Sequence, residues 1–214
     1  MIILKNCRLI PELTEGYEGE YADILVEDGK IAQIAAPGRP YPGDAEIIDC
    51  EGCTVLPGFF DLHCHLCYDK LDDYSSMNDK AEAYTTMDCY NFAKAYLRQG
   101  YTTLRDAGTL HSVTAKLTRM AKAGVIDPIP DILSTCRALT PTNPSNDEYI
   151  ELYEVCDGPD EVRKAVRKQF ENGADLIKFM ATGCFLDESG NPGITIVTED
   201  ELRAAVEIAE MRGT

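Results

Sequence analysis

Residues 55–65 read VLPGFFDLHCH, and the pattern of the chain changes across this stretch. Before Pro57-Gly58 the sequence predicts short antiparallel strands, with a hairpin around Asp28-Gly29, a dipeptide typical of a type I′ turn. After it, apolar strand-like runs alternate with helical runs. We therefore predict two domains: a small β-sandwich-type segment over residues 1–55 and an α/β domain over residues 56–214.

The second part contains four units in which a strand is followed by a helix. This alternation predicts a parallel sheet with right-handed crossovers. A doubly wound sheet and the first half of a (β/α)8 barrel both fit it, and no phosphate-binding glycine motif follows any strand. The predicted strands cover residues 59–65, 102–106, 132–136 and 175–180, and the predicted helices cover residues 79–98, 112–123, 159–171 and 199–212.

The composition is that of a folded and acidic protein. Hydrophobic residues make up 44% of the 214 residues, and 37 acidic against 20 basic residues give a formal net charge of −17. Such a surface repels phosphate backbones and anionic lipid, which argues against nucleic acid and membranes as partners. No apolar run approaches the roughly 20 residues of a membrane span, and the N-terminus lacks the basic region of a signal peptide.

Nine cysteines are present, an odd number in a chain without a secretion signal. This usage predicts a cytoplasmic protein with reduced thiols. Two Cys-x-x-Cys pairs, Cys50/Cys53 and Cys64/Cys67, leave open a structural zinc site of an interaction module. The apolar sequence between the pairs favours a core strand instead.

Two of the three histidines lie close together in the first strand of the α/β part. Because side chains alternate along a strand, we expect Asp61, His63 and His65 to share one face and Leu62 and Cys64 to share the other. Two imidazoles at this spacing can bind one metal ion, and imidazole suits zinc. The sequence thus predicts a metal site, the alternative being a chance His-x-His pattern.

A single lysine, Lys178, interrupts the fourth apolar strand between Ile177 and Phe179. An ammonium group is costly to bury, so it needs a carboxylate partner, a lowered pKa or a chemical change. A neutral amine can take up carbon dioxide to become a carbamate, an anionic group able to bridge two metal ions. On its own this strand favours the simpler interpretation, an ion-paired or snorkelling lysine.

The segments TVLPGFFDLHCH, GYTTLRDAGT and GADLIKFMATG together resemble the amidohydrolase superfamily, in particular its imidazolonepropionase-related and Xaa-Pro dipeptidase-like branches. Residues 24–34 and 47–58 are similar to the small β domain that precedes the barrel. The resemblance implies a (β/α)8 barrel with one or two divalent metal ions, zinc being the first choice, at the C-terminal ends of its strands. It implies that His63 and His65 are ligands from strand 1 and that Lys178 is the carboxylated bridging ligand of strand 4.

The activity implied is metal-dependent hydrolysis of a C–N bond in a small amide, cyclic amide or dipeptide. The family's remaining ligands, two histidines and a proton-shuttling aspartate from later strands, have no counterpart, because no histidine follows His111. Residues 210–214 fall where a fifth strand would begin. We therefore expect the N-terminal half of a barrel, without a catalytic residue of its own, that self-associates or pairs with a complementing chain. The alternative is a non-catalytic fragment or subunit.

Other residues near the expected site carry weaker expectations. Residues 137–145, RALTPTNPS, stand where the dipeptidase-like branch often has a Gly-Gly-His segment, which leaves the substrate open. We expect Arg105 and Asp106 to be structural ion-pairing groups first and substrate contacts second. We expect His111 to be a solvent-facing residue at a helix start, and Cys184 is a minor candidate to line the pocket.

Overall fold

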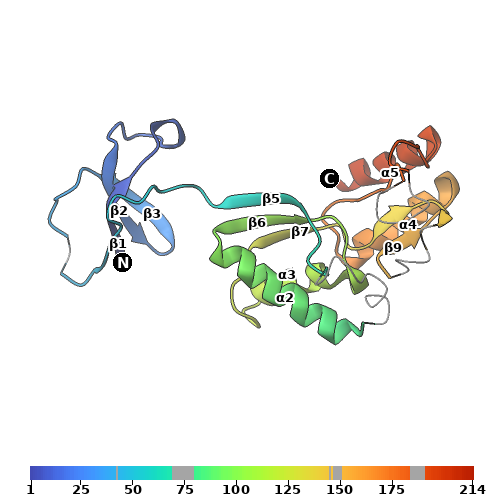
Figure 1. The fold of residues 1–214 in the computed structure, drawn as a ribbon, viewed down its shortest axis with the longest axis horizontal. Coiled ribbons are helices and arrows are strands. Elements are labelled where there is room, and N and C mark those ends of the chain that lie inside the picture. The colour runs from blue at the N-terminus through green and yellow to red at the C-terminus, as the bar shows by residue number, and fades with distance from the viewer. Residues whose placement is uncertain (42, 69–79, 145, 147–150, 184–190) are drawn as a thin grey trace. The chain divides into compact units, whose positions relative to one another are not determined.

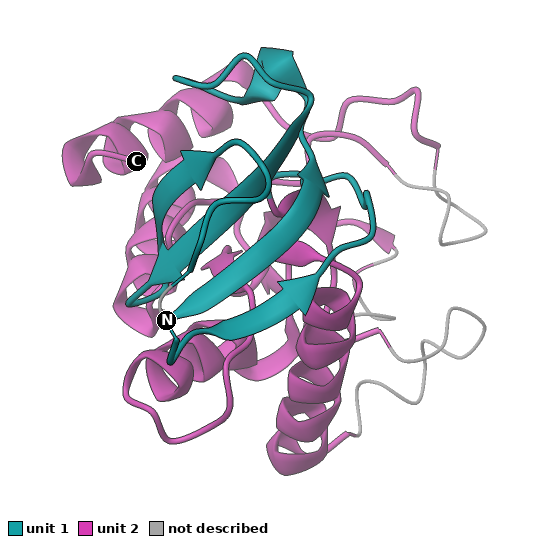
Figure 2. Cartoon of the chain, turned by 90° about the vertical axis from the view of Figure 1, so that its left-hand side faces the viewer, with its two compact units in different colours: residues 1–57 teal, residues 58–214 magenta. Residues whose placement is uncertain are grey.

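The computed structural model describes residues 1–41, 43–68, 80–144, 146, 151–183 and 191–214. The chain forms two compact units, Met1–Pro57 and Gly58–Thr214, which Figure 2 colours separately. No helix in the described residues is long and apolar enough to cross a membrane.

Unit 1 is built on one four-stranded sheet with the order β3-β2-β1-β4. The Asp28-Gly29 turn joins β2 to β3 with positive φ angles at both residues, as a type I′ turn requires, so the predicted hairpin is confirmed. β4 pairs parallel to β1, where the sequence had suggested antiparallel strands, and the described residues of this unit form a single sheet rather than a sandwich. The elements are β1 (Ile2–Arg8), the short helix η1 (Pro11–Leu13), β2 (Tyr21–Glu27), β3 (Lys30–Ala35) and β4 (Glu46–Asp49).

Unit 2 is a mixed α/β structure with parallel strands, as predicted. Its main sheet has the order β5-β6-β7, and all neighbouring strands run parallel. Figure 1 shows α2 and α3 on one face of this sheet, where Cys64, Leu104 and Ile132 are buried against them. The elements are β5 (Phe59–Cys64), α2 (Glu82–Arg98), β6 (Tyr101–Asp106), η2 (Leu110–Ser112), α3 (Val113–Lys122) and β7 (Asp131–Ser134).

The opposite face of the β5-β6-β7 sheet exposes large apolar side chains. Side chains alternate along each strand, so Phe60 of β5 and Leu133 of β7 point away from the two helices. They are 61% and 43% exposed, and Leu62 is 51% exposed. An apolar face of this kind is one that other protein atoms would normally cover.

The chain after β7 continues the parallel order in shorter pieces. β8 (Ala138–Thr140) pairs with β9 (Tyr153–Val155), and Phe179 forms a parallel bridge with Leu139 of β8. The predicted third strand therefore ends at Ser134, because Cys136 has a positive φ of 58°. The predicted fourth strand is only this one bridge within an extended segment.

The four predicted helices are all present. The last two are α4 (Gly158–Asn172) and α5 (Glu199–Arg212). The capping box predicted at the start of α5 is formed by Thr198 and Glu201, and Gly213 ends the helix with a φ of 78°. These signals are local, which explains why the sequence placed them correctly.

Candidate functional site

An open cavity of about 270 Å³ lies where the strands of unit 2 end. Its walls come from β5, β6, the residue after β7 and the extended segment that follows α4. Ligand sites in parallel α/β structures lie at this carboxyl end of the strands. The lining residues are His63, Arg105, Ala107, Thr135, Leu176, Ile177, Lys178 and Phe179.

A β-bulge in β5 determines which side chains reach this cavity. Three steps along β5, from Asp61 to Cys64, match only two along β6, from Leu104 to Asp106. The bulge breaks the alternation, so the prediction that Asp61 shares a face with the two histidines is wrong. Asp61 instead accepts a hydrogen bond from Tyr96 of α2, with 3.0 Å between the oxygens.

The two histidines lie side by side, with their ring centroids 5.5 Å apart. Nδ1 of His65 is 2.9 Å from the carbonyl oxygen of Gly108. Because a carbonyl only accepts, Nδ1 carries the proton and Nε2 keeps its lone pair. The ring also stacks on Tyr68, 4.8 Å between centroids. Metal-binding histidines are typically held in this way by a hydrogen bond to the second nitrogen.

Both imidazoles are favoured in their neutral form. Burial lowers the pKa of His63, and the positive charges of Lys178 and Arg105 lower it further. Burial also lowers the pKa of His65, an effect that outweighs its hydrogen bond to Gly108. A neutral imidazole is the form that binds a metal ion.

Lys178 lies beside the histidines without an anionic partner. Its side chain makes no ion pair and no hydrogen bond within the part of the chain that the structure describes. Burial, followed by the charge of Arg105, lowers the pKa of its amine. The simpler interpretation of an ion-paired lysine thus finds no partner among these residues.

Arg105 and Asp106 point to opposite sides of β6 and form no ion pair with each other or with another described residue, so the predicted ion-pairing role is wrong. Arg105 lines the cavity and donates a hydrogen bond from Nε to the carbonyl of Leu62. Asp106 is fully buried. Consecutive strand residues alternate between faces, which is the physical reason that the pair is separated.

The remaining candidates lie away from the cavity or outside the described residues. His111 is partly buried rather than solvent-facing, with Nε2 3.1 Å from the carbonyl of Lys80. Cys64 is a buried core residue, as predicted. Burial raises the pKa of Cys64 and of Cys67 to about 12, as expected for thiols that pack in the core. Cys184 lies outside the described residues.

Gly108, whose carbonyl accepts the hydrogen bond from His65, is a residue of this site that the sequence reasoning missed. The Asp-Ala-Gly sequence directly after a strand was the available signal, because a glycine there permits a turn toward the strand end. In the described ranges, no three His, Cys, Asp or Glu side chains gather closely enough to hold a metal ion.

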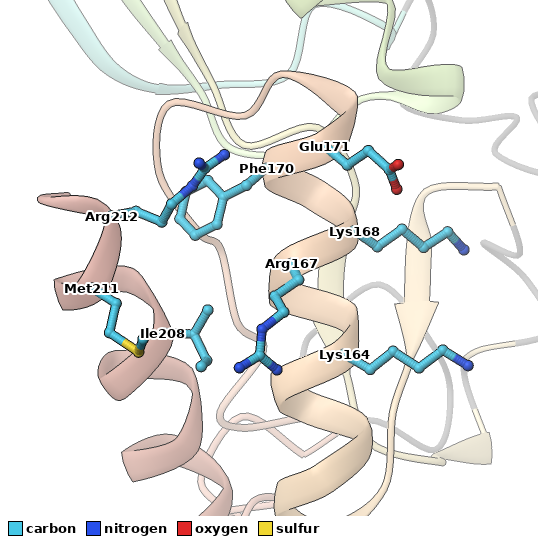
Figure 3. A pocket seen from close by; sticks show the side chains of 8 residues that line it. All are labelled: Lys164, Arg167, Lys168, Phe170, Glu171, Ile208, Met211 and Arg212. Atoms are coloured by element: carbon cyan, nitrogen blue, oxygen red, sulfur yellow. The ribbon is translucent and has the colours of Figure 1, made fainter.

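A second hollow of about 650 Å³ lies between α4 and α5 (Figure 3). Its apolar part consists of Phe170, Ile208 and Met211. The other lining residues are charged, four basic and one acidic: Lys164, Arg167, Lys168, Arg212 and Glu171. None of its lining residues belongs to the cavity at the strand ends, so it is separate from the histidine site.

Comparison with known proteins places this geometry in context. Residues 54–214 match the amidohydrolase family. An ochratoxinase from Aspergillus niger is 30% identical over 184 residues, which is 73% of this chain and 37% of that protein. A dihydroorotase from Mycobacterium tuberculosis is 55% identical over 49 residues, which is 23% of this chain and 11% of that protein.

Solved structures share the fold over the entire chain. A prolidase complexed with N-methylphosphonate-L-proline has a TM-score of 0.80 at 26% identity, covering 100% of this chain and 54% of that structure. A Xaa-Pro dipeptidase with bound methionine has a TM-score of 0.83 at 24% identity, covering 100% of this chain and 55% of that structure. The chain thus spans about half the length of each.

Proposed function

The chain belongs to the amidohydrolase family, and from this we propose that it carries part of the metal centre of an enzyme that hydrolyses a C–N bond. The family assignment confirms the resemblance drawn from the sequence. By family the protein is a C–N bond hydrolase. We assign His63, His65 and Lys178 as metal ligands.

The observation that carries this proposal is the position of Lys178. Its amine lies by the two neutral histidines, has a lowered pKa and lacks a carboxylate partner among the described residues. A deprotonated amine attacks carbon dioxide, which forms an N–C bond and releases one proton. The resulting carbamate supplies the anionic ligand that this cationic cavity lacks.

The residues present fit a divalent metal ion. Nε2 of His65 is left free by the Gly108 hydrogen bond, and both histidines are favoured as neutral ligands. Imidazole with an oxygen anion suits zinc, and we propose one or two such ions. When bound, the metal would lower the pKa of a water molecule and polarise the substrate carbonyl.

We propose that the four β/α units form the first half of a (β/α)8 barrel, with residues 1–55 as part of a separate β domain. The parallel order from β5 to the extended segment around Phe179 supports this. The exposed apolar face of the sheet is the one that faces the interior of a closed barrel. We propose that self-association or a complementing chain supplies further ligands to the metal centre.

We propose a small amide, cyclic amide or dipeptide as the substrate. Arg105 lines the cavity, and its guanidinium could pair with a substrate carboxylate. The free thiols of the eight described cysteines fit a reducing compartment, and we propose a cytoplasmic location. The alternative, a non-catalytic metal-binding fragment or subunit, is favoured by the small number of donors at the described site.

The test is to supply zinc and ¹³C-labelled bicarbonate to the purified chain. We expect bound zinc and a carbamate carbon resonance, both lost in Lys178→Ala and the zinc partly restored by acetate or propionate. Lys164→Ala on α4, which leaves the strand-end cavity intact, is the matched control. Zinc binding without hydrolysis of dipeptides would favour the non-catalytic alternative, and absence of both zinc and carbamate would overturn the proposal.

A further inference from the structure

Asp106 is a buried acid that the proposed chemistry does not use. It ends β6 and is 0% exposed. Its Oδ1 accepts a hydrogen bond from the N–H of Gly108, with 3.3 Å between the heavy atoms. The carbonyl of Gly108 in turn accepts the hydrogen bond from Nδ1 of His65. Two hydrogen bonds at one glycine therefore connect Asp106 to a proposed metal ligand.

The backbone N–H groups of both neighbours of Gly108 are hydrogen-bonded. The N–H of Ala107 donates to the carbonyl of Cys64, and the N–H of Thr109 donates to the carbonyl of Cys136, each at 2.9 Å. The second bond fixes the peptide group whose carbonyl faces His65. The N–H of Gly108 lies between these two bonded N–H groups and donates to Oδ1 of Asp106.

The backbone conformation at this position favours glycine. Gly108 has a φ of 147°, which side-chain-bearing residues rarely adopt. A Cβ atom there would lie 3.6 Å from Nδ1 of His65 and 3.5 Å from Leu152. The turn is therefore in van der Waals range of the imidazole ring, and the conformation of Gly108 is what disfavours a side chain there.

We propose that Asp106 is a positioning residue: it holds the N–H of Gly108 so that the Gly108 carbonyl selects the Nδ1–H tautomer of His65 and presents Nε2 to the metal. This inference rests on the proposed function for the metal itself. The tautomer of His65, however, is a property of the chain without metal, so the two can be tested separately.

Burial of the Asp106 carboxyl group costs desolvation free energy, and its hydrogen bond to Gly108 gives a reason for an acid at this position. A carboxylate without a cationic partner is unfavourable in a core, and an apolar residue of similar size would avoid that penalty. An apolar residue, however, would leave the N–H of Gly108 buried without an acceptor.

The experiment compares Asp106→Leu, which removes the acceptor, with Asp106→Asn, which keeps a side-chain oxygen. The ¹⁵N spectrum of the histidines reports the His65 tautomer, and calorimetry reports zinc affinity. We expect D106L to mix the tautomers and to weaken zinc binding about 10- to 100-fold, in the range seen for lost supports of metal ligands. We expect D106N to restore both properties.

Gln169→Leu is the matched control, because Gln169 is also 0% exposed and accepts a backbone N–H, that of Arg137. Equal losses in Q169L and D106L, or failure of D106N to restore the tautomer, would overturn the proposal. The wild-type spectrum also decides: a dominant Nε2–H tautomer of His65 would overturn it even if D106L does not fold. A wild-type chain with the Nδ1–H tautomer but no zinc affinity would refute the proposed function and leave the positioning role standing.

Discussion

The hydroxyl of Tyr96 on α2 donates a hydrogen bond to Oδ2 of Asp61, two residues before His63 on β5. Burial, together with the Asp61 carboxylate, raises the pKa of Tyr96 to about 12. We predict that Tyr96→Phe lowers the free energy of unfolding by about 1 kcal/mol. Since the folded pKa exceeds the unfolded value of about 10, this contribution is full below pH 10 and is lost as the pH rises toward 12.

Urea unfolding at pH 7 and pH 11 measures this difference. Tyr84→Phe is the control, because Tyr84 lies on the same helix and is 71% exposed. Equal unfolding free energies for Y96F and Y84F at pH 7 would contradict the prediction.

The buried carboxyl group of Asp106 leads to a second predicted pH dependence of stability, at lower pH than that of Tyr96. Burial raises its pKa from 3.8 to about 7, an effect only partly opposed by Thr114 and by the N–H groups of Gly108 and Leu66. Because its pKa in the folded chain exceeds the unfolded value, Asp106 makes its full contribution to stability below about pH 4, and this contribution is lost as the pH rises through 7. We predict that Asp106→Asn unfolds at the same or lower urea concentration than wild type at pH 4.5, and at a higher one at pH 8. A difference that stays constant between the two pH values would show that Asp106 does not titrate in this way.

The exposed apolar face of the main sheet predicts self-association. Phe60 and Leu62 are more than half exposed on β5. We predict that the double substitution Phe60→Ser with Leu62→Ser shifts the chain toward the monomer in light scattering after gel filtration. Val125→Ser, at a residue 67% exposed outside the strands, should leave the mass unchanged. A wild-type chain that is monomeric at high concentration would contradict this expectation.

The cysteines should differ sharply in reactivity, because only the thiolate reacts. Cys53 is exposed, whereas Cys7, Cys64 and Cys67 are buried with pKa values raised to about 12, chiefly by burial. We predict that iodoacetamide at pH 8 labels Cys53 in the folded chain and the other three only in urea. Peptide mapping by mass spectrometry measures the extent. Rapid labelling of Cys64 or Cys67 in the folded state would show that β5 opens readily.

The sequence predicted those elements whose signals are local. The capping box of Thr198 and the hairpin turn at Asp28-Gly29 each depend on a few adjacent residues, and both are confirmed. The alternation of strands and helices likewise predicted the parallel sheet. The end of β7 at Ser134 was missed. The positive φ of Cys136 could not be predicted, because no glycine or asparagine marks this position in the sequence.

The candidate site was predictable in its residues but only partly in its geometry. His63 and Lys178 do line one cavity, but a regular strand was assumed around them. The bulge in β5 depends on pairing with β6, a contact between residues some 40 positions apart, which no local pattern reveals. The contact of the Gly108 carbonyl with His65 was missed for the same reason: the Asp-Ala-Gly sequence indicates a turn, but the two residues are 43 positions apart.

The bulge between Asp61 and Cys64 also bears on any attempt to transplant this site into another protein. A His-x-His pair copied onto a regular strand of a designed scaffold would keep its spacing but aim its rings differently, because side-chain direction there follows strict alternation. A faithful graft would carry the extra residue of β5, the tyrosine that fixes Asp61 and the glycine turn beneath His65. The transferable unit is thus two neighbouring strands and one helix, rather than the histidine motif.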